Sequence, residues 1–231
     1  GGLTTGSYPD RRAGIDEDHV PVTADSGAGS PGASVPAGGG DALGLNRIEL
    51  LLDAHRPDEA LRVLGPRLAQ APHDVQLLTL LGRIQAQRQD HEAMLQVANA
   101  LVGNDLHEAV LELHFPSSVI LFTRPLLIAI TGADFSPSIN GEPVPLNQCI
   151  VVNKNDALQF HRPVSGARAC LAVQGGFILS PWLESQSTNL KAAAGGYEGR
   201  SLRKGDELIC RTEREYSKLL NGKNFRVLPW T

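Results

Sequence analysis

After about residue 110 the sequence alternates short apolar runs with turn-forming residues, a pattern that leaves no room for long helices. Five such runs are VILF, LLIAI, CIVV, ALQFH and ACLAV, all within residues 119–173. Asn140-Gly141 is the strongest local signal of a hairpin, because both positions tolerate positive φ. Short strands this close together predict an antiparallel all-β domain that closes on itself or packs as a sandwich.

Upstream of that region the spacing of the apolar residues is helical. Apolar side chains recur at steps of three and four from Leu45, and again after Pro57 and Pro72, which predicts three amphipathic helices in tandem. Residues 58–61 (DEAL) have a similar counterpart in residues 91–94 (HEAM), about 33 residues further on. A helical repeat with this period resembles a tetratricopeptide repeat. An ordinary helical hairpin is the alternative, because one and a half repeats are fewer than such arrays usually need.

The chain therefore divides into three parts. Residues 21–44 are mostly Gly, Ala, Ser and Pro, the composition of a flexible linker, and we expect residues 1–44 to form a flexible N-terminal segment. Residues 45–92 hold the tetratricopeptide-like helices, and residues 93–231 hold the β-rich part. The predicted fold class is α+β.

Composition limits the classes of partner. A net charge of −4 and an isoelectric point near 6.0 argue against a nucleic-acid-binding protein, since binding phosphates needs concentrated Lys and Arg. The sequence has no apolar run long enough to cross a membrane and no secretory signal pattern, so we expect a cytoplasmic protein that does not bind a membrane. We interpret the three cysteines as reduced core residues, and no spacing of zinc ligands is present.

Five motifs occur in one order along the β-rich part: LVGN (101–104), TGAD (131–134), RACLAVQGG (168–176), SQSTNL (185–190) and GGYEGRSLRKGDEL (195–208). This series resembles the C subunit of the prokaryotic 5-oxoprolinase, the KipA-like or allophanate-hydrolase-subunit-2 group. That group is related to the carboxyltransferase domain of urea carboxylase, whose members pass a carboxyl group from biotin.

The resemblance implies a cyclophilin-like antiparallel β-barrel, of which this chain would hold the first of two similar halves. It also implies two partners, the KipI-like B subunit and the A subunit of 5-oxoprolinase, with which the C subunit hydrolyses the small amide 5-oxoproline to glutamate. The reaction uses ATP, which we expect on one of the partners, so that this chain itself binds no cofactor and no metal.

The sequence also departs from the family pattern. The N-terminal GLTT of the family is present, but the expected Gln-Asp-x-Gly-Arg loop is replaced by the linker and the helices. The second half of the family pattern does not follow residue 231. We therefore expect the site in this chain to be incomplete on its own and the chain to associate with partners.

No self-contained set of catalytic residues is evident, so the catalytic residues stay unassigned. The resemblance implies candidate substrate-binding residues at the mouth of the barrel, where a carboxylate and a guanidinium can orient a small amide and its carboxylate. Three glycines in the last motif are expected to shape a tight loop, in which Glu198 and Arg200 can pair. The candidates for substrate binding are Asp134, Ser187, Thr188, Glu198 and Arg200, and the loop-shaping residues are Gly195, Gly196 and Gly199.

Three interpretations of the whole chain remain open at this point. In the first, the chain is part of one subunit of a 5-oxoprolinase-like amide hydrolase. The second is a non-catalytic binding or regulatory protein, either a KipA-like antagonist of a KipI-like partner or a tetratricopeptide-type scaffold. The third is a chimera of two genes, because both ends of the helical insert fall inside the family motif region. The last motif has a structural alternative as well, a barrel corner with no contact to substrate.

Overall fold

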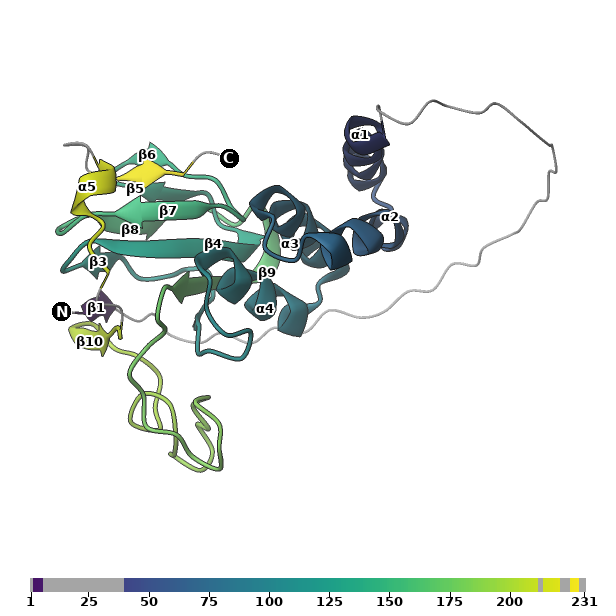
Figure 1. Cartoon of the computed structure of the whole chain (residues 1–231). Coiled ribbons are helices and arrows are strands. Elements are labelled where there is room, and N and C mark those ends of the chain that lie inside the picture. The colour runs from purple at the N-terminus through teal and green to yellow at the C-terminus, as the bar shows by residue number, and fades with distance from the viewer. Residues whose placement is uncertain (1, 6–39, 212–213, 221–224, 229–231) are drawn as a thin grey trace, which may run out of the picture.

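The computed structural model describes residues 2–5, 40–211, 214–220 and 225–228 (Figure 1). Most of the predicted N-terminal linker lies outside the described residues. Its two ends are described: Gly2–Thr5 form strand β1, and the first helix begins at Gly40, five residues before the predicted start.

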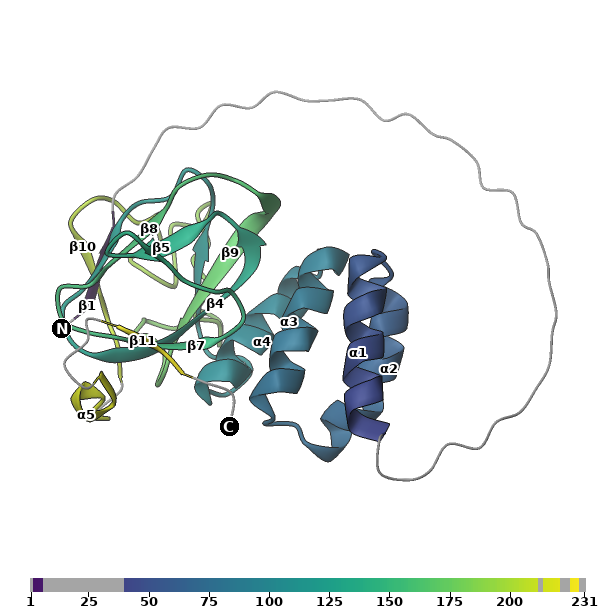
Figure 2. The ribbon, with the colours of Figure 1, turned by 90° about the horizontal axis from the view of Figure 1, so that it is seen from above.

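Four helices follow one another, and each packs against the next (Figure 2). They are α1 (Gly40–Asp53), α2 (Pro57–Gln70), α3 (Val75–Arg88) and α4 (His91–Val102). Pro57 begins α2, and the side chains of Asp74 and Asp90 cap α3 and α4 by accepting hydrogen bonds from backbone N–H groups.

The first three helices have a small core of their own. The largest fully buried side chains in it are Ile48 and Leu52 of α1, Leu64 of α2 and Ile84 of α3. The predicted amphipathic helices are therefore present. Their interpretation as a tetratricopeptide-like unit stays a prediction.

The strands form two antiparallel sheets. The six-stranded sheet has the order β10–β1–β3–β8–β5–β6, and the five-stranded sheet has the order β11–β7–β4–β9–β2. A short helix, α5 (Ser217–Leu220), precedes the last strand. The remaining strands are β2 (Leu111–Leu113), β3 (Ile120–Phe122), β4 (Leu126–Asp134), β5 (Pro137–Ile139), β6 (Glu142–Pro143), β7 (Cys149–Val152), β8 (Ala157–Phe160), β9 (Ser165–Val173), β10 (Asp206–Ile209) and β11 (Arg226–Val227).

The five-stranded sheet is covered on both faces. Alternate residues of β4, such as Ile128 and Ile130, face the six-stranded sheet and form the larger core with it. The residues between them, such as Leu127 and Ala129, belong to a second core with the apolar face of α4. Burial on both faces explains why LLIAI is apolar without alternation.

The closed barrel that the resemblance implied is not seen among the described residues. The hydrogen-bonded ladders end at β10 and β6 in one sheet and at β11 and β2 in the other, so the strands stack as two sheets instead of closing. Each of the five predicted apolar runs does form a strand. Asn140 and Gly141 form the predicted hairpin turn between β5 and β6, with φ of 54° and 86°.

Strand β1 is an interior strand of the six-stranded sheet, next to the edge strand β10. Gly2–Thr5 pair with β10 on one side and with β3 on the other. The helices and the residues that precede them are thus an insertion between two neighbouring strands of one sheet (Figure 1).

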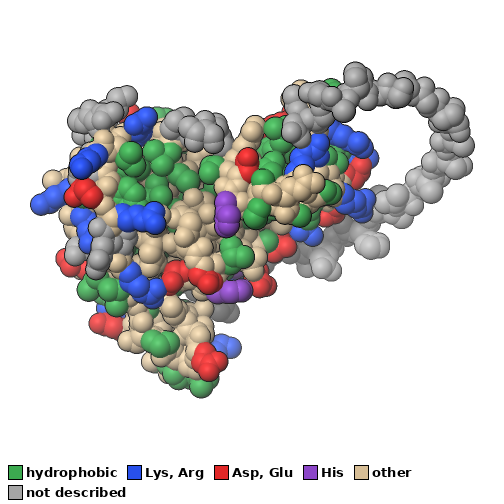
Figure 3. Space-filling view, viewed as in Figure 1, with side chains coloured by type: hydrophobic (Ala, Val, Ile, Leu, Met, Phe, Trp, Pro, Cys, Tyr) green, Lys and Arg blue, Asp and Glu red, His purple; other side chains and the backbone are tan. Residues whose placement is uncertain are grey.

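Charges of both signs are interspersed on the face shown in Figure 3. Across the ranges that the structure describes, no helix combines the length and the apolar character needed to cross a bilayer.

Candidate functional site

The first two family motifs hold the helices to the sheet. Thr131 of TGAD is fully buried and its hydroxyl donates a hydrogen bond to the carbonyl oxygen of Met94 in α4, at 3.0 Å. Asn104 of LVGN accepts a hydrogen bond from the backbone N–H of Gly175 at 2.8 Å and donates to the carbonyl oxygen of Val173 at 2.9 Å. These contacts give both motifs a structural role.

A long loop, residues 178–205, projects away from the sheets and leads into β10 (Figure 1). It holds the fourth motif and most of the last one, whose final residues 206–208 lie in β10. The glycines that were predicted to shape it do so by close approach and positive φ. A Cβ on Gly196 would lie 2.0 Å from the Thr188 hydroxyl, and one on Gly199 would lie 2.1 Å from the carbonyl carbon of Ala193. A Cβ on Gly195 would meet the carbonyl oxygen of Ser187 at 2.6 Å.

Arg200 is the centre of a charged cluster within this loop. Its guanidinium pairs with Glu198 at 2.8 Å, as the sequence predicted, and also with Asp206 at 2.7 Å. It lies 4.9 Å from the ring centroid of Tyr197. Hydrogen bonding by Arg200 lowers the pKa of Asp206 to about 2. Because these charges satisfy one another, the arrangement favours the structural role of a loop corner.

Ser187 and Thr188 are hydrogen-bonded to neighbouring groups of the loop. The Thr188 hydroxyl accepts a hydrogen bond from the backbone N–H of Tyr197 at 3.2 Å, and the Ser187 N–H donates to the Ser185 hydroxyl at 3.1 Å. The side chain of Ser187 is exposed. Both hydroxyl groups thus belong to the same loop as Glu198 and Arg200.

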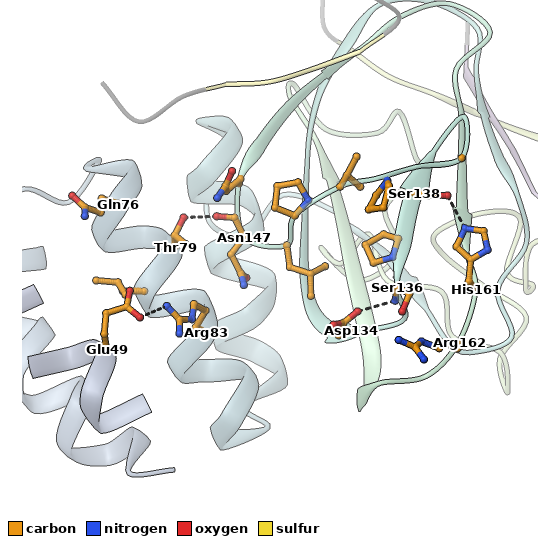
Figure 4. A pocket seen from close by; sticks show the side chains of 18 residues that line it. Glu49, Gln76, Thr79, Arg83, Asp134, Ser136, Ser138, Asn147, His161 and Arg162 are labelled. Atoms are coloured by element: carbon orange, nitrogen blue, oxygen red, sulfur yellow. Dashed lines mark hydrogen bonds and ion pairs between the residues drawn. The ribbon is translucent and has the colours of Figure 1, made fainter. Parts of the chain in front are cut away.

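Asp134 lies elsewhere, in a cavity of about 900 Å³ between α3 and the corner at the end of β4. We call this cavity the helix–sheet groove (Figure 4). One wall carries Glu49, Gln76, Thr79 and Arg83 from α1 and α3, and the other carries Asp134, Ser138, His161 and Arg162. Since no residue of the 178–205 loop lines the groove, the structure does not bring the five sequence-predicted residues into one site.

Asp134 and Ser136 form the corner of the sheet wall. The Asp134 carboxylate accepts a hydrogen bond from the backbone N–H of Ser136 at 2.7 Å, and Ser136 has a φ of 52°, which is uncommon for a residue with a side chain. This local turn directs the chain from β4 into β5, so that Pro137 and Ser138 line the groove as well.

The groove also contains a pair of side chains that the sequence did not predict, Ser138 and His161. The Ser138 hydroxyl lies 2.7 Å from His161 Nε2, a distance at which a histidine can act as a base toward a serine. Ser138 is only 2% exposed, and no carboxylate among the described residues pairs with His161. The pair therefore lacks the third member of a catalytic triad and is suited to hydrogen bonding with a ligand.

Possible metal ligands do not cluster in the part of the chain that the structure describes. No group of three or more His, Cys, Asp or Glu side chains there is placed to hold a metal ion. The groove offers guanidinium, imidazole, amide, hydroxyl and carboxylate groups.

Comparison with known proteins gives a consistent match to the β-rich part. The family model described as carboxyltransferase domain, subdomain A and B, matches residues 90–226. The C subunit of 5-oxoprolinase from Escherichia coli (strain K12) is 34% identical over 142 residues, which are 58% of this chain and 46% of that protein. Urea amidolyase of Lachancea kluyveri is 36% identical over 127 residues, covering 55% of this chain and 7% of that one.

A solved structure agrees with these matches. The crystal structure of the K. lactis urea amidolyase superimposes with a TM-score of 0.50 at 32% identity, over 52% of this chain and 7% of that one. The chain spans less than half the length of these relatives. Because the family model matches more than half of the sequence, the chain belongs to the family of the carboxyltransferase domain, subdomain A and B.

Proposed function

We propose that this chain is part of the C subunit of an ATP-dependent 5-oxoprolinase-like amide hydrolase in the cytoplasm, which converts 5-oxoproline to glutamate. The C subunits of 5-oxoprolinase from Escherichia coli and Haemophilus influenzae support this assignment at 34% and 33% identity. In this proposal the A or the B subunit binds ATP, and the family part from about residue 93 contributes to the substrate site. Residues 45–92 would form a helical unit that packs against this part through α3.

The observation that carries the proposal is the helix–sheet groove. A carboxylate, Asp134, and an imidazole that is already hydrogen-bonded, His161, line the same wall of it on the family part of the chain. Such groups orient an amide and exchange protons with it. Ser187, Thr188, Glu198 and Arg200 would then serve as a contact surface for the B subunit, because they lie in the projecting loop, outside the groove.

The test is a reconstitution with the A and B subunits of a bacterial 5-oxoprolinase. ATP-dependent release of glutamate from 5-oxoproline would be measured with this chain and, for comparison, with a complete C subunit. We expect activity above that of the two partners alone, and we expect Asp134→Ala and His161→Ala to reduce it at least tenfold. A stable complex without any release of glutamate would remove the enzymatic assignment.

A second candidate is a non-catalytic binding or regulatory protein of the KipA type or with a scaffolding helical unit. The specific observation in its favour is that Arg200 is paired with both Glu198 and Asp206, so that its guanidinium serves the structure of the loop. This candidate predicts that the chain binds a KipI-like B subunit tightly and lowers or leaves unchanged the activity of the complex.

A further inference from the structure

The two walls of the helix–sheet groove come from different parts of the chain. Gln76, Thr79 and Arg83 are spaced by three and four residues on α3, so they share one face of that helix. They lie outside the part that the family model matches, residues 90–226, whereas Asp134, Ser138, His161 and Arg162 lie inside it. Figure 4 shows the two groups facing each other across the groove. The helical insertion therefore completes a groove that the family part alone leaves open.

The width of the groove is fixed by direct contact between the walls. The Thr79 hydroxyl of α3 donates a hydrogen bond to the carbonyl oxygen of Asn147, a residue that is buried on the sheet side. Gly82 packs so closely on the same asparagine that a Cβ would lie 2.3 Å from its Oδ1. A ligand in the groove would thus meet two walls already held at a set separation, which lowers the cost of ordering them.

Each wall presents one arginine. Arg83 is held by Glu49, with Nη1 and Oε2 2.7 Å apart, and this bond uses one of the five N–H donors of the guanidinium. Arg162 on the opposite wall is exposed, and among the described residues no side chain pairs with its guanidinium. Asp134 is engaged with the backbone N–H of Ser136.

We propose that the helix–sheet groove binds a small carboxylate, held between Arg83 and Arg162, and that Arg83 is a specificity-determining residue contributed by the helical insertion. Guanidinium groups bind carboxylates through paired N–H donors with defined geometry. The polar groups beside them, His161 on the sheet wall and Gln76 on the helical wall, are placed to hydrogen-bond the rest of the ligand. The choice of 5-oxoproline as the first probe rests on the proposed function. The assignment of a small carboxylate as the class of ligand rests on the two arginines alone.

The test uses the full chain and direct binding, measured by isothermal titration calorimetry or by saturation-transfer NMR. The probes are 5-oxoproline, L-glutamate and glutarate, together with 5-oxoprolinamide, in which the carboxylate is replaced by a neutral amide. We expect at least one of the three carboxylates to bind and the amide to bind at least tenfold more weakly than 5-oxoproline where 5-oxoproline binds. We expect Arg83→Gln and Arg162→Gln each to weaken carboxylate binding at least tenfold.

The matched control is Arg62→Gln, which removes an exposed arginine from α2, away from the groove, and should bind as the unaltered chain does. Circular dichroism and the thermal midpoint confirm that each variant is folded. Carboxylate binding that is equal in Arg83→Gln, Arg162→Gln and Arg62→Gln would overturn the proposal, as would the absence of binding by all three carboxylates.

The outcomes separate this inference from the proposed function. Arginine-dependent carboxylate binding without glutamate release in the reconstituted complex would leave the binding site standing and remove the enzymatic role. Glutamate release that is unaffected by Arg83→Gln and Arg162→Gln would remove the binding site and leave the enzymatic role standing.

Discussion

Arg200 and Asp206 meet through two parallel hydrogen bonds, Nη1 to Oδ2 at 2.7 Å and Nη2 to Oδ1 at 3.0 Å. The same carboxylate accepts a third hydrogen bond from the backbone N–H of Arg203, at 2.6 Å. This relationship connects the end of the 178–205 loop to the first residue of β10, and it makes the stability of that corner depend on pH.

The first prediction concerns acid stability. Because its folded-state pKa lies near 2 instead of 3.8, Asp206 stabilises the fold above about pH 4, and this contribution is lost as the pH falls toward 2. Asp206→Asn should lower the urea midpoint at pH 7 and flatten its fall between about pH 4 and pH 2. Glu207→Gln, an exposed neighbour on β10, is the control and should retain the steeper profile. Identical profiles for the two variants would contradict the assigned role of Asp206.

The second prediction concerns the junction between α4 and the sheet. Asn104 makes three hydrogen bonds there, to Val173, Gly175 and the Asn99 side chain. Asn104→Ala should therefore lower the free energy of unfolding by about 2–4 kcal/mol, given roughly 1 kcal/mol for each hydrogen bond and the partners left unsatisfied. Asn46→Ala, at an exposed position of α1, should change it by less than about 0.5 kcal/mol in the same urea titration. A loss below about 1 kcal/mol in Asn104→Ala would count against this junction.

The third prediction separates steric contact from backbone conformation in the 178–205 loop. Gly196 and Gly205 both have positive φ, 52° and 93°, but only Gly196 has neighbours within reach of a Cβ. Gly205→Ala should cost about 1–2 kcal/mol from conformation alone. Gly196→Ala should cost at least about 1 kcal/mol more, since Thr188 must move. Equal losses in chemical denaturation would show that the contact between Gly196 and Thr188 is loose.

The fourth prediction concerns the cysteines. Cys149, Cys170 and Cys210 are free and buried, as expected from the sequence, and burial raises their pKa values to about 11, 12 and 11. At pH 8 the folded chain should therefore resist iodoacetamide at all three positions, and mass spectrometry should find three labelled sites only after unfolding in urea. Rapid labelling of any one of them in the folded chain would show that its position opens to solvent.

The strands could be predicted because their signals are local. The apolar runs and the Asn140-Gly141 turn can each be recognised from a few neighbouring residues. The strands lie at the positions of these runs. The stacking of two sheets in place of a closed barrel depends on which strand edges meet, and no short stretch of sequence records that.

The helix–sheet groove could not be predicted for the same reason. Ser138 and His161 are 23 residues apart and meet because β5 pairs with β8 and the chain turns back at His161. Arg83 reaches the groove because Gly82 allows α3 to approach Asn147 closely. The resemblance placed Asp134 and Arg200 in one candidate site because both lie in family motifs. The order of motifs along a chain does not give the distances between their side chains in the fold.

The interior position of β1, between β10 and β3, has a consequence for the order of events during folding. Residues 2–5 are synthesised before the rest of the sheet, yet their hydrogen-bonding partners stand at residues 121–122 and 206–209. Contacts so distant along the chain form late, because the intervening segment must first be brought together. Until then β3 and β10 each present an open edge on which another chain can pair. The six-stranded sheet thus becomes continuous only when Gly2–Thr5 insert between β3 and β10, strands that follow the whole helical insertion.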